Sequence, residues 1–119
     1  MKYKITEVFI EVNGKKLFQI ECVKGFKHAD KGDKGGYIEK EENLSQHGNS
    51  WVFSNARVSG DAWVYGNALV YGDARVYGNA LVYGDAWVSG NALVYGNARV
   101  SDNARCKSLP PATRDLIIK

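Results

Sequence analysis

An apolar pattern with a period of six residues runs through the middle of the chain, from Gln46 to Arg105. A valine recurs at every sixth position from Val52 to Val100, and Cys106 takes the next such position. A small residue, alanine in every unit after the first, stands two positions before each of these anchors. Because residues two apart in a strand point to the same side, the anchors and the small residues predict one continuous apolar face.

Turn-forming residues separate the apolar positions. The units have the form Ala-x-Val-(Tyr/Ser)-Gly-(Asn/Asp), and Gly and Asn tolerate the positive φ that a tight corner requires. The pattern predicts short strands joined by corners, with three units closing a triangular coil and ten units making roughly three coils stacked about 4.8 Å apart. An α-helix does not fit, because the period is not 3.6 and a glycine in each turn would cost about 1 kcal/mol.

The repeat resembles the hexapeptide-repeat superfamily, whose members fold as left-handed parallel β-helices. The resemblance is strongest over residues 46–105 and implies an all-β hexapeptide solenoid. The segment GDKGGYIEKEENLSQHGNSWV, from Gly32 to Val52, followed by V-x-G-(N/D)-A units, is similar to small β-solenoid proteins of phages, prophages and bacteria. Such proteins are often labelled hexapeptide transferases or polymer-forming proteins, but a shared fold does not establish a shared activity.

The flanking segments are expected to cap this solenoid, because its end coils expose apolar core and unpaired strand edges. Residues 2–23 predict a β-hairpin around Asn13-Gly14, a strong signal for a two-residue turn. Tyr37, Ile38 and Leu44 are expected to plug the open top. The predicted parts are an N-terminal hairpin and capping segment (1–45), the left-handed β-helix (46–107) and a short C-terminal cap of helix or strand (108–119).

A coil of three units also predicts which outward side chains stack. At the corners this register places no Asp directly above another Asp, which avoids repulsion between stacked like charges. The predicted columns are Trp51, Leu69, Trp87 and Arg105 beside Phe53, Tyr71, Ser89 and Lys107 on the first face; Arg57, Arg75 and Leu93 beside Ser59, Tyr77 and Tyr95 on the second; and Trp63, Leu81 and Arg99 beside Tyr65, Tyr83 and Ser101 on the third.

The apolar side chains on the first and third faces predict self-association. So much exposed apolar surface is unusual on a monomer, and a homotrimer with parallel prism axes, common among hexapeptide proteins, would bury it. The alternative is that the aromatic residues only form cross-strand ladders that stiffen the sheets. The predicted contact residues are Trp51, Phe53, Trp63, Tyr65, Leu69, Tyr71, Leu81, Tyr83 and Trp87.

Catalytic chemistry finds little support in the sequence. Acyltransferases of the superfamily that the repeat resembles use a histidine as general base, whereas His28 and His47 both fall outside the regular coils. Two histidines also fall short of the three that hold zinc in carbonic anhydrases of this fold. The stretch from Gly32 to Gly36 suits a phosphate cradle but lacks the full P-loop pattern. We therefore expect no metal and no cofactor, and keep a coenzyme A-dependent acyltransferase as an alternative.

Binding is the favoured function. Arg57 and Arg75 are expected to stack beside Tyr77 and Tyr95, with Arg99 on the third face. Arginine with aromatic residues suits nucleotide-like or phosphorylated ligands and equally suits protein interfaces, which the sequence does not separate. The leading hypothesis is a non-enzymatic, oligomeric binding protein with a phage or prophage accessory role, such as inhibiting a host defence or sequestering a nucleotide signal. A structural protein that polymerises end to end is a further alternative.

Charge and cysteine content add expectations about location and partners. The chain has no run of about 18 apolar residues, so no membrane span is expected. A net charge of +3 does not predict sequence-specific DNA binding. Cys22 and Cys106 lie far apart, and the first residues lack the apolar stretch of a secretory signal, which together indicate a reduced cytoplasmic protein.

Overall fold

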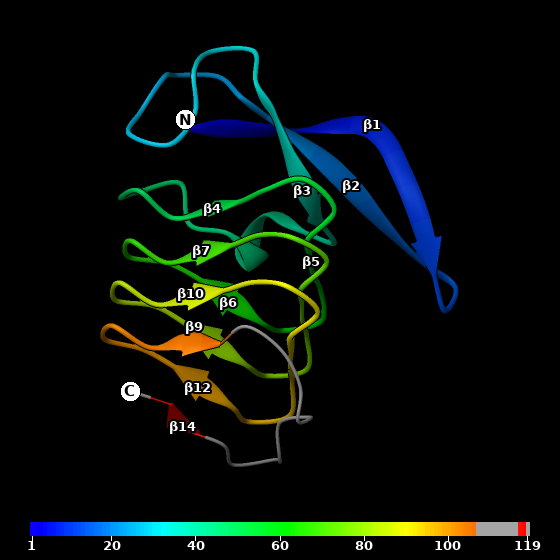
Figure 1. Cartoon of the computed structure of the whole chain (residues 1–119). Helices are drawn as coiled ribbons and strands as arrows, with labels where there is room; N and C mark the ends of the chain where they lie inside the picture. The colour runs from blue at the N-terminus through cyan, green and yellow to red at the C-terminus, as the bar shows by residue number, and fades with distance from the viewer. Residues whose placement is uncertain (107–116, 119) are drawn as a thin grey trace.

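A computed structural model of the chain describes residues 1–106 and 117–118 and shows an all-β parallel solenoid of about four turns (Figure 1). Three sheets run along the stack, and one of them continues into an antiparallel hairpin. The elements are β1 (Tyr3–Val12), β2 (Lys15–Cys22), β3 (Lys34–Ile38), the 3₁₀ helix η1 (Glu41–Asn43), β4 (Trp51–Val52), β5 (Arg57–Val58), β6 (Trp63–Val64), β7 (Leu69–Val70), β8 (Arg75–Val76), β9 (Leu81–Val82), β10 (Trp87–Val88), β11 (Leu93–Val94), β12 (Arg99–Val100), β13 (Arg105–Cys106) and β14 (Ile117–Ile118).

Three repeat units close each turn, as predicted. The first face contains β4, β7, β10 and β13, the second β5, β8 and β11, and the third β6, β9 and β12, all in parallel register. Val70 pairs with Val88 in the next rung. The predicted columns of stacked side chains are therefore confirmed on all three faces for the described residues. Lys107 lies outside those residues, and the left-handed sense of the coil stays a prediction.

The interior is filled by the small and medium residues that the repeat places there. Every valine and alanine anchor from Val52 to Val100 is at most 1% exposed. Each corner turns at a residue with positive φ, which at Gly78 is +69°. A Cβ atom on Gly78 would lie 2.8 Å from the backbone nitrogen of Gly96 in the next rung, so close stacking as well as conformation requires glycine there.

The parallel ladder begins before the hexapeptide pattern does. β3 pairs with β5 so that Ile38 lies beside Val58, and Leu44 forms an isolated parallel bridge with Val64. Ile38 and Leu44 are buried in the core, whereas Tyr37 is half-buried and lies in register with Arg57 on the outside. These residues add a further rung instead of acting as a plug, which is one reason why the solenoid has about four turns and not three.

The predicted hairpin is present and extends the second face. β1 and β2 are antiparallel and joined by Asn13-Gly14, with φ values of 51° and 80°. β2 also pairs antiparallel with β3, so that the sheet order is β1-β2-β3-β5-β8-β11. Figure 1 shows the hairpin leaving the top of the stack and bending down so that its turn hangs beside the coils.

At the other end, the backbone of β14 pairs in parallel with β12 and adds a rung to the third face. The remainder of the predicted C-terminal cap, residues 108–116 and 119, lies outside the described residues. Within the described part of the chain, no helix is both long enough and apolar enough to span a membrane.

Candidate ligand-binding cleft

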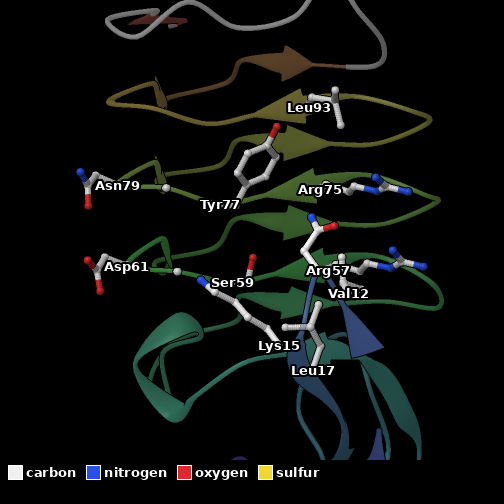
Figure 2. A pocket seen from close by; sticks show the side chains of 13 residues that line it. Val12, Lys15, Leu17, Arg57, Ser59, Asp61, Arg75, Tyr77, Asn79 and Leu93 are labelled. Carbon is white, nitrogen blue, oxygen red and sulfur yellow. The ribbon is translucent and has the colours of Figure 1, made fainter. Parts of the chain in front are cut away.

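A cleft of about 500 Å³ lies between the turn of the β1–β2 hairpin and the second face of the solenoid. In Figure 2 the N-terminal end of the stack is at the bottom. The hairpin side chains approach the N-terminal rungs of the sheet, and the side chains of the following rungs lie above them. Sheet and corner contribute Arg57, Ser59, Gly60, Asp61, Arg75, Tyr77, Gly78, Asn79 and Leu93, and the hairpin contributes Val12, Asn13, Lys15 and Leu17.

Two arginines on adjacent rungs form the positive part of this cleft. Arg57 in β5 and Arg75 in β8 pair in parallel register, so their Cα atoms are separated by about one rung spacing, ~4.8 Å. Their side chains extend in the same direction in Figure 2. None of the ion pairs among residues 1–106 involves either arginine, although both stand near carboxylates. Both guanidinium groups are therefore available to an anion.

The same two arginines border a second hollow, of about 450 Å³, on the side away from the hairpin. Its other walls are Leu93 and the corner residues Asn55, Asp73 and Asn91. The arginine pair thus separates an aromatic hollow under the hairpin from a polar one along the corner.

Two acidic residues near the cleft, Asp61 and Glu39, have lysine partners. Lys40 Nζ lies 2.9 Å from Asp61 Oδ1, and this hydrogen bond lowers the pKa of the Asp61 carboxyl. Lys15 Nζ lies 3.9 Å from Glu39 Oε1, which also accepts a hydrogen bond of 2.7 Å from the Gly60 backbone N–H. Asp61 and Glu39 thus face lysines, whereas Asp73, in the second hollow, has no ion-pair partner among residues 1–106, so the positive charge of the two arginines is only partly offset.

The tyrosine column of the second face borders the cleft. Tyr77 and Tyr95 are stacked with ring centroids 5.3 Å apart and planes inclined by 8°. Tyr77 lines the cleft and is 36% exposed, whereas Tyr95 stands behind it, half-buried against the core cluster. The column therefore presents a single tyrosine ring to the cleft.

The structure thus gathers four of the five predicted binding residues. Arg57, Arg75 and Tyr77 line the cleft and Tyr95 supports Tyr77, but Arg99 is on the third face, in register with Leu81. The sequence did not indicate the wall formed by the hairpin. The Asn13-Gly14 turn was visible in the sequence, but its position over the arginines depends on the antiparallel pairing of β2 with β3.

Two of the predicted oligomer contacts need correction. Trp51 is 1% exposed and Leu69 is 8% exposed, so neither offers a side chain to another subunit. The N-terminal segment covers Trp51, since the rings of Tyr3 and Phe26 pack on it at centroid distances of 6.3 and 5.2 Å. Other predicted contacts keep exposed surface, which is 44% for Trp63 and 39% for Trp87 and partial for Phe53, Tyr65, Tyr71, Leu81 and Tyr83.

The two histidines lie apart from the arginine cleft. His28 is half-buried, and its ring packs edge-on near Phe26 and Phe53, at 6.3 and 6.4 Å. Burial and the nearby charge of Lys27 lower the pKa of His28, whereas His47 is exposed. Among the described residues, no three histidine, cysteine or acidic side chains are grouped so that they could hold a metal ion.

The glycine-rich stretch before the solenoid does not form an open phosphate cradle. Gly35 and Gly36 are buried inside β3. A Cβ atom at these positions would lie 2.6 Å from the Val52 carbonyl oxygen and 2.5 Å from the Ala56 carbonyl oxygen, respectively. These glycines permit the close approach of β3 to the first coil.

Together, the parallel ladders and the six-residue units define the chain as a hexapeptide-like β-solenoid protein. Residues 62–76, 74–90 and 86–102 match the family model described as the YdcK beta solenoid repeat. These matches extend from the rung of β6 to that of β12 and cover about a third of the chain. No curated protein matches the chain.

Proposed function

We propose that this protein is a non-enzymatic binding protein whose cleft beside the hairpin captures a phosphorylated ligand. The observation that carries the proposal is the pair Arg57 and Arg75, stacked on adjacent rungs without a carboxylate partner among residues 1–106. Guanidinium groups bind phosphate through paired, charge-assisted hydrogen bonds. Two stacked arginines therefore suit a ligand whose phosphate oxygens can accept hydrogen bonds from both. Lys15 on the hairpin also lines the cleft, where it faces Glu39.

The proposal is tested by calorimetric titration of the protein with inorganic pyrophosphate. We expect binding that weakens with increasing salt, because the contacts are charge-assisted and partly exposed. The double variant Arg57→Ala/Arg75→Ala should lose it. The matched control is Arg99→Ala, which removes an exposed arginine of the same repeat position from another face and should bind like wild type. Equal binding by the double variant and the control would refute the proposed site.

The biological setting that we propose is a phage or prophage accessory role in the cytoplasm, in which the protein removes a phosphorylated signal of the host. The phage role rests on the resemblance of the segment from Gly32 to Val52 to such proteins, and the cytoplasmic setting is consistent with Cys22 and Cys106 as free thiols. Native mass spectrometry of protein purified from a bacterial host would then show a retained phosphorylated molecule, and the Arg57→Ala/Arg75→Ala variant would lack it.

We also propose that the protein assembles as a homotrimer through the third face and the lower part of the first. The support is the exposed area of Trp63 and Trp87 together with the flat stack of Tyr65 and Tyr83, whose rings are 5.0 Å apart with planes inclined by 6°. Burial of such rings between subunits would contribute favourably to association. The same native mass spectrum gives the subunit number, and a monomer at micromolar concentration would rule the trimer out.

A further inference from the structure

The tyrosine column of the second face ends at the rung of β8, two strands before the hairpin. Tyr77 and Tyr95 follow one another in this column, but the preceding rung carries Ser59. The backbone N–H of Ser59 donates to the carbonyl oxygen of Val76, which fixes Ser59 beside Tyr77 in the ladder. Because serine carries no ring, the space over Ser59 that a third tyrosine would fill stays open, and it forms part of the cleft.

The corresponding column on the third face shows how the chain closes such a stack. There Tyr65 and Tyr83 are stacked, and the ring of Trp63 covers Tyr65 at a centroid distance of 4.0 Å. On the second face the residue that corresponds to Trp63 in the rung of Tyr77 is Arg75, which provides charge but no ring. The ring of Tyr77 therefore keeps a face that no aromatic group of the described residues covers.

The spacing between rungs suits one aromatic ring at the open position. Rungs are about 4.8 Å apart, within the range of centroid distances at which aromatic rings stack. Tyr77 bounds the position on one side. On the other side lies Glu39, whose backbone N–H donates to the Val58 carbonyl oxygen and whose carboxylate is held by Gly60 and Lys15. Figure 2 shows Ser59 between Lys15 and Tyr77.

From this arrangement we infer that the phosphorylated ligand is a nucleotide, whose base stacks on Tyr77 over Ser59 while its phosphates reach Arg57 and Arg75. Both arginines belong to the same two rungs as Ser59 and Tyr77, and their side chains extend away from Tyr77 in Figure 2, so the ligand must be long enough to reach them from the open position. Asn13 and Asn79 also line the cleft, and the amide of Asn13 can donate to or accept from the edge of a base. This inference rests on the proposed function of the arginine pair.

The test is a pair of calorimetric titrations, one with adenosine diphosphate and one with inorganic pyrophosphate, which lacks the base. Base stacking on an aromatic side chain should make the nucleotide bind roughly tenfold more tightly than pyrophosphate. Tyr77→Leu should remove that advantage, measured as the ratio of the two dissociation constants. Ser59→Tyr should do the same by filling the open position with the chain's own ring. Tyr65→Leu, on the third face, is the control and should keep the advantage.

The outcomes separate the two proposals. Pyrophosphate binding that requires Arg57 and Arg75, without any advantage for the nucleotide, would overturn the base position and leave the phosphate site standing. An equal loss of both ligands in Tyr77→Leu would also overturn it, because the tyrosine would then only support the arginines. Absence of binding for both ligands to wild type would overturn the proposed function and the inference together.

Discussion

The coils and the N-terminal end of the solenoid satisfy the same backbone groups in different ways. Within the coils, each rung donates to the next through the backbone, as the Asp61 N–H does to the Gly78 carbonyl oxygen at 2.8 Å. At the top no complete rung precedes the first coil, and side chains replace it. Asn43 Nδ2 donates to the carbonyl oxygens of Gly60 and Ala62 at 3.1 and 2.9 Å, and Lys2 Nζ donates to that of Ser50 at 2.7 Å.

This difference has an energetic consequence. A coil rung repeats many equivalent contacts, so a single side chain on its outer surface contributes little. The end depends on a few buried polar groups, each of which would leave unpaired partners if it were removed, and an unpaired buried group costs about 1–3 kcal/mol. Substitutions at the end should therefore be more destabilising than substitutions of the same residue type on the coils.

The largest effect is expected for Asn43→Ala. The Asn43 side chain is fully buried, and besides its two donated bonds its Oδ1 accepts from the backbone N–H groups of Glu39 and Lys40 at 3.0 and 2.9 Å. Its removal leaves two carbonyls and two N–H groups without this partner, and we expect a loss of roughly 3–5 kcal/mol in the free energy of unfolding, measured by urea denaturation.

The matched control is Asn97→Ala, which removes an exposed asparagine from a coil corner and should change stability by less than about 0.5 kcal/mol. Losses of similar size in the two variants would mean that the end of the solenoid is no more dependent on single side chains than its coils are.

A smaller effect is expected when the backbone of a coil corner is obstructed. Gly78→Ala places a Cβ atom 2.8 Å from the Gly96 nitrogen at a φ of +69°, and we expect a loss of roughly 2–4 kcal/mol from strain and displaced stacking. Ser54 turns another corner with a φ of +53°, so Ser54→Gly serves as the opposite change and should not destabilise the protein. Thermal unfolding followed by circular dichroism measures the stability of both variants. A Gly78→Ala variant as stable as wild type would show that the corner accommodates a Cβ atom without strain.

The regular coils and the irregular N-terminal end also differ in how well the sequence predicts them. The register of the coils could be predicted in full, because every unit repeats the same positions and Val70 over Val88 follows from counting. The rung of β3 could not, because residues 34–38 lack the repeat signature and Ile38 pairs with Val58, twenty positions on, while the coil rungs are eighteen apart. The contacts of an irregular segment depend on how it packs, and its sequence contains no periodic pattern from which they could be predicted.

The cleft likewise has one wall that the repeat predicts and one that it does not. The column of Arg57 and Arg75 was predictable from the repeat, and so was the neighbouring tyrosine column. The hairpin wall was not, because it depends on where a strand pair with an irregular register between Ile5 and Phe9 directs its turn. For the same reason the sequence placed Trp51 on the surface, whereas Phe26, in the loop that follows the hairpin, covers it.

The smallest of the expected effects concerns Lys2 and depends on pH. Burial lowers the pKa of the Lys2 ammonium from 10.5 to about 8. Between these pH values the unfolded chain still holds a proton that the folded protein has released, so the contribution of Lys2 to stability rises with pH through this window. Below pH 8 the lysine is charged in both states and the cost of burying its charge is fully present. We expect the stability of wild type relative to Lys2→Met to rise on the order of 2 kcal/mol from pH 8 to 10.5.

The comparison with Lys2→Met is needed because two neighbouring groups titrate with the opposite sign. Burial raises the pKa values of Tyr3 and Cys22, so both groups withdraw stability as the pH rises above their ordinary pKa values. Both are present in the variant as well, and most of their contribution cancels in the difference between the two urea denaturation curves. A difference that stays flat from pH 8 to 10.5 would mean that the ammonium keeps its hydration in the folded protein. The carbonyls of Gly48 and Ser50 would then be satisfied by water, and this end of the solenoid would not depend on a buried lysine.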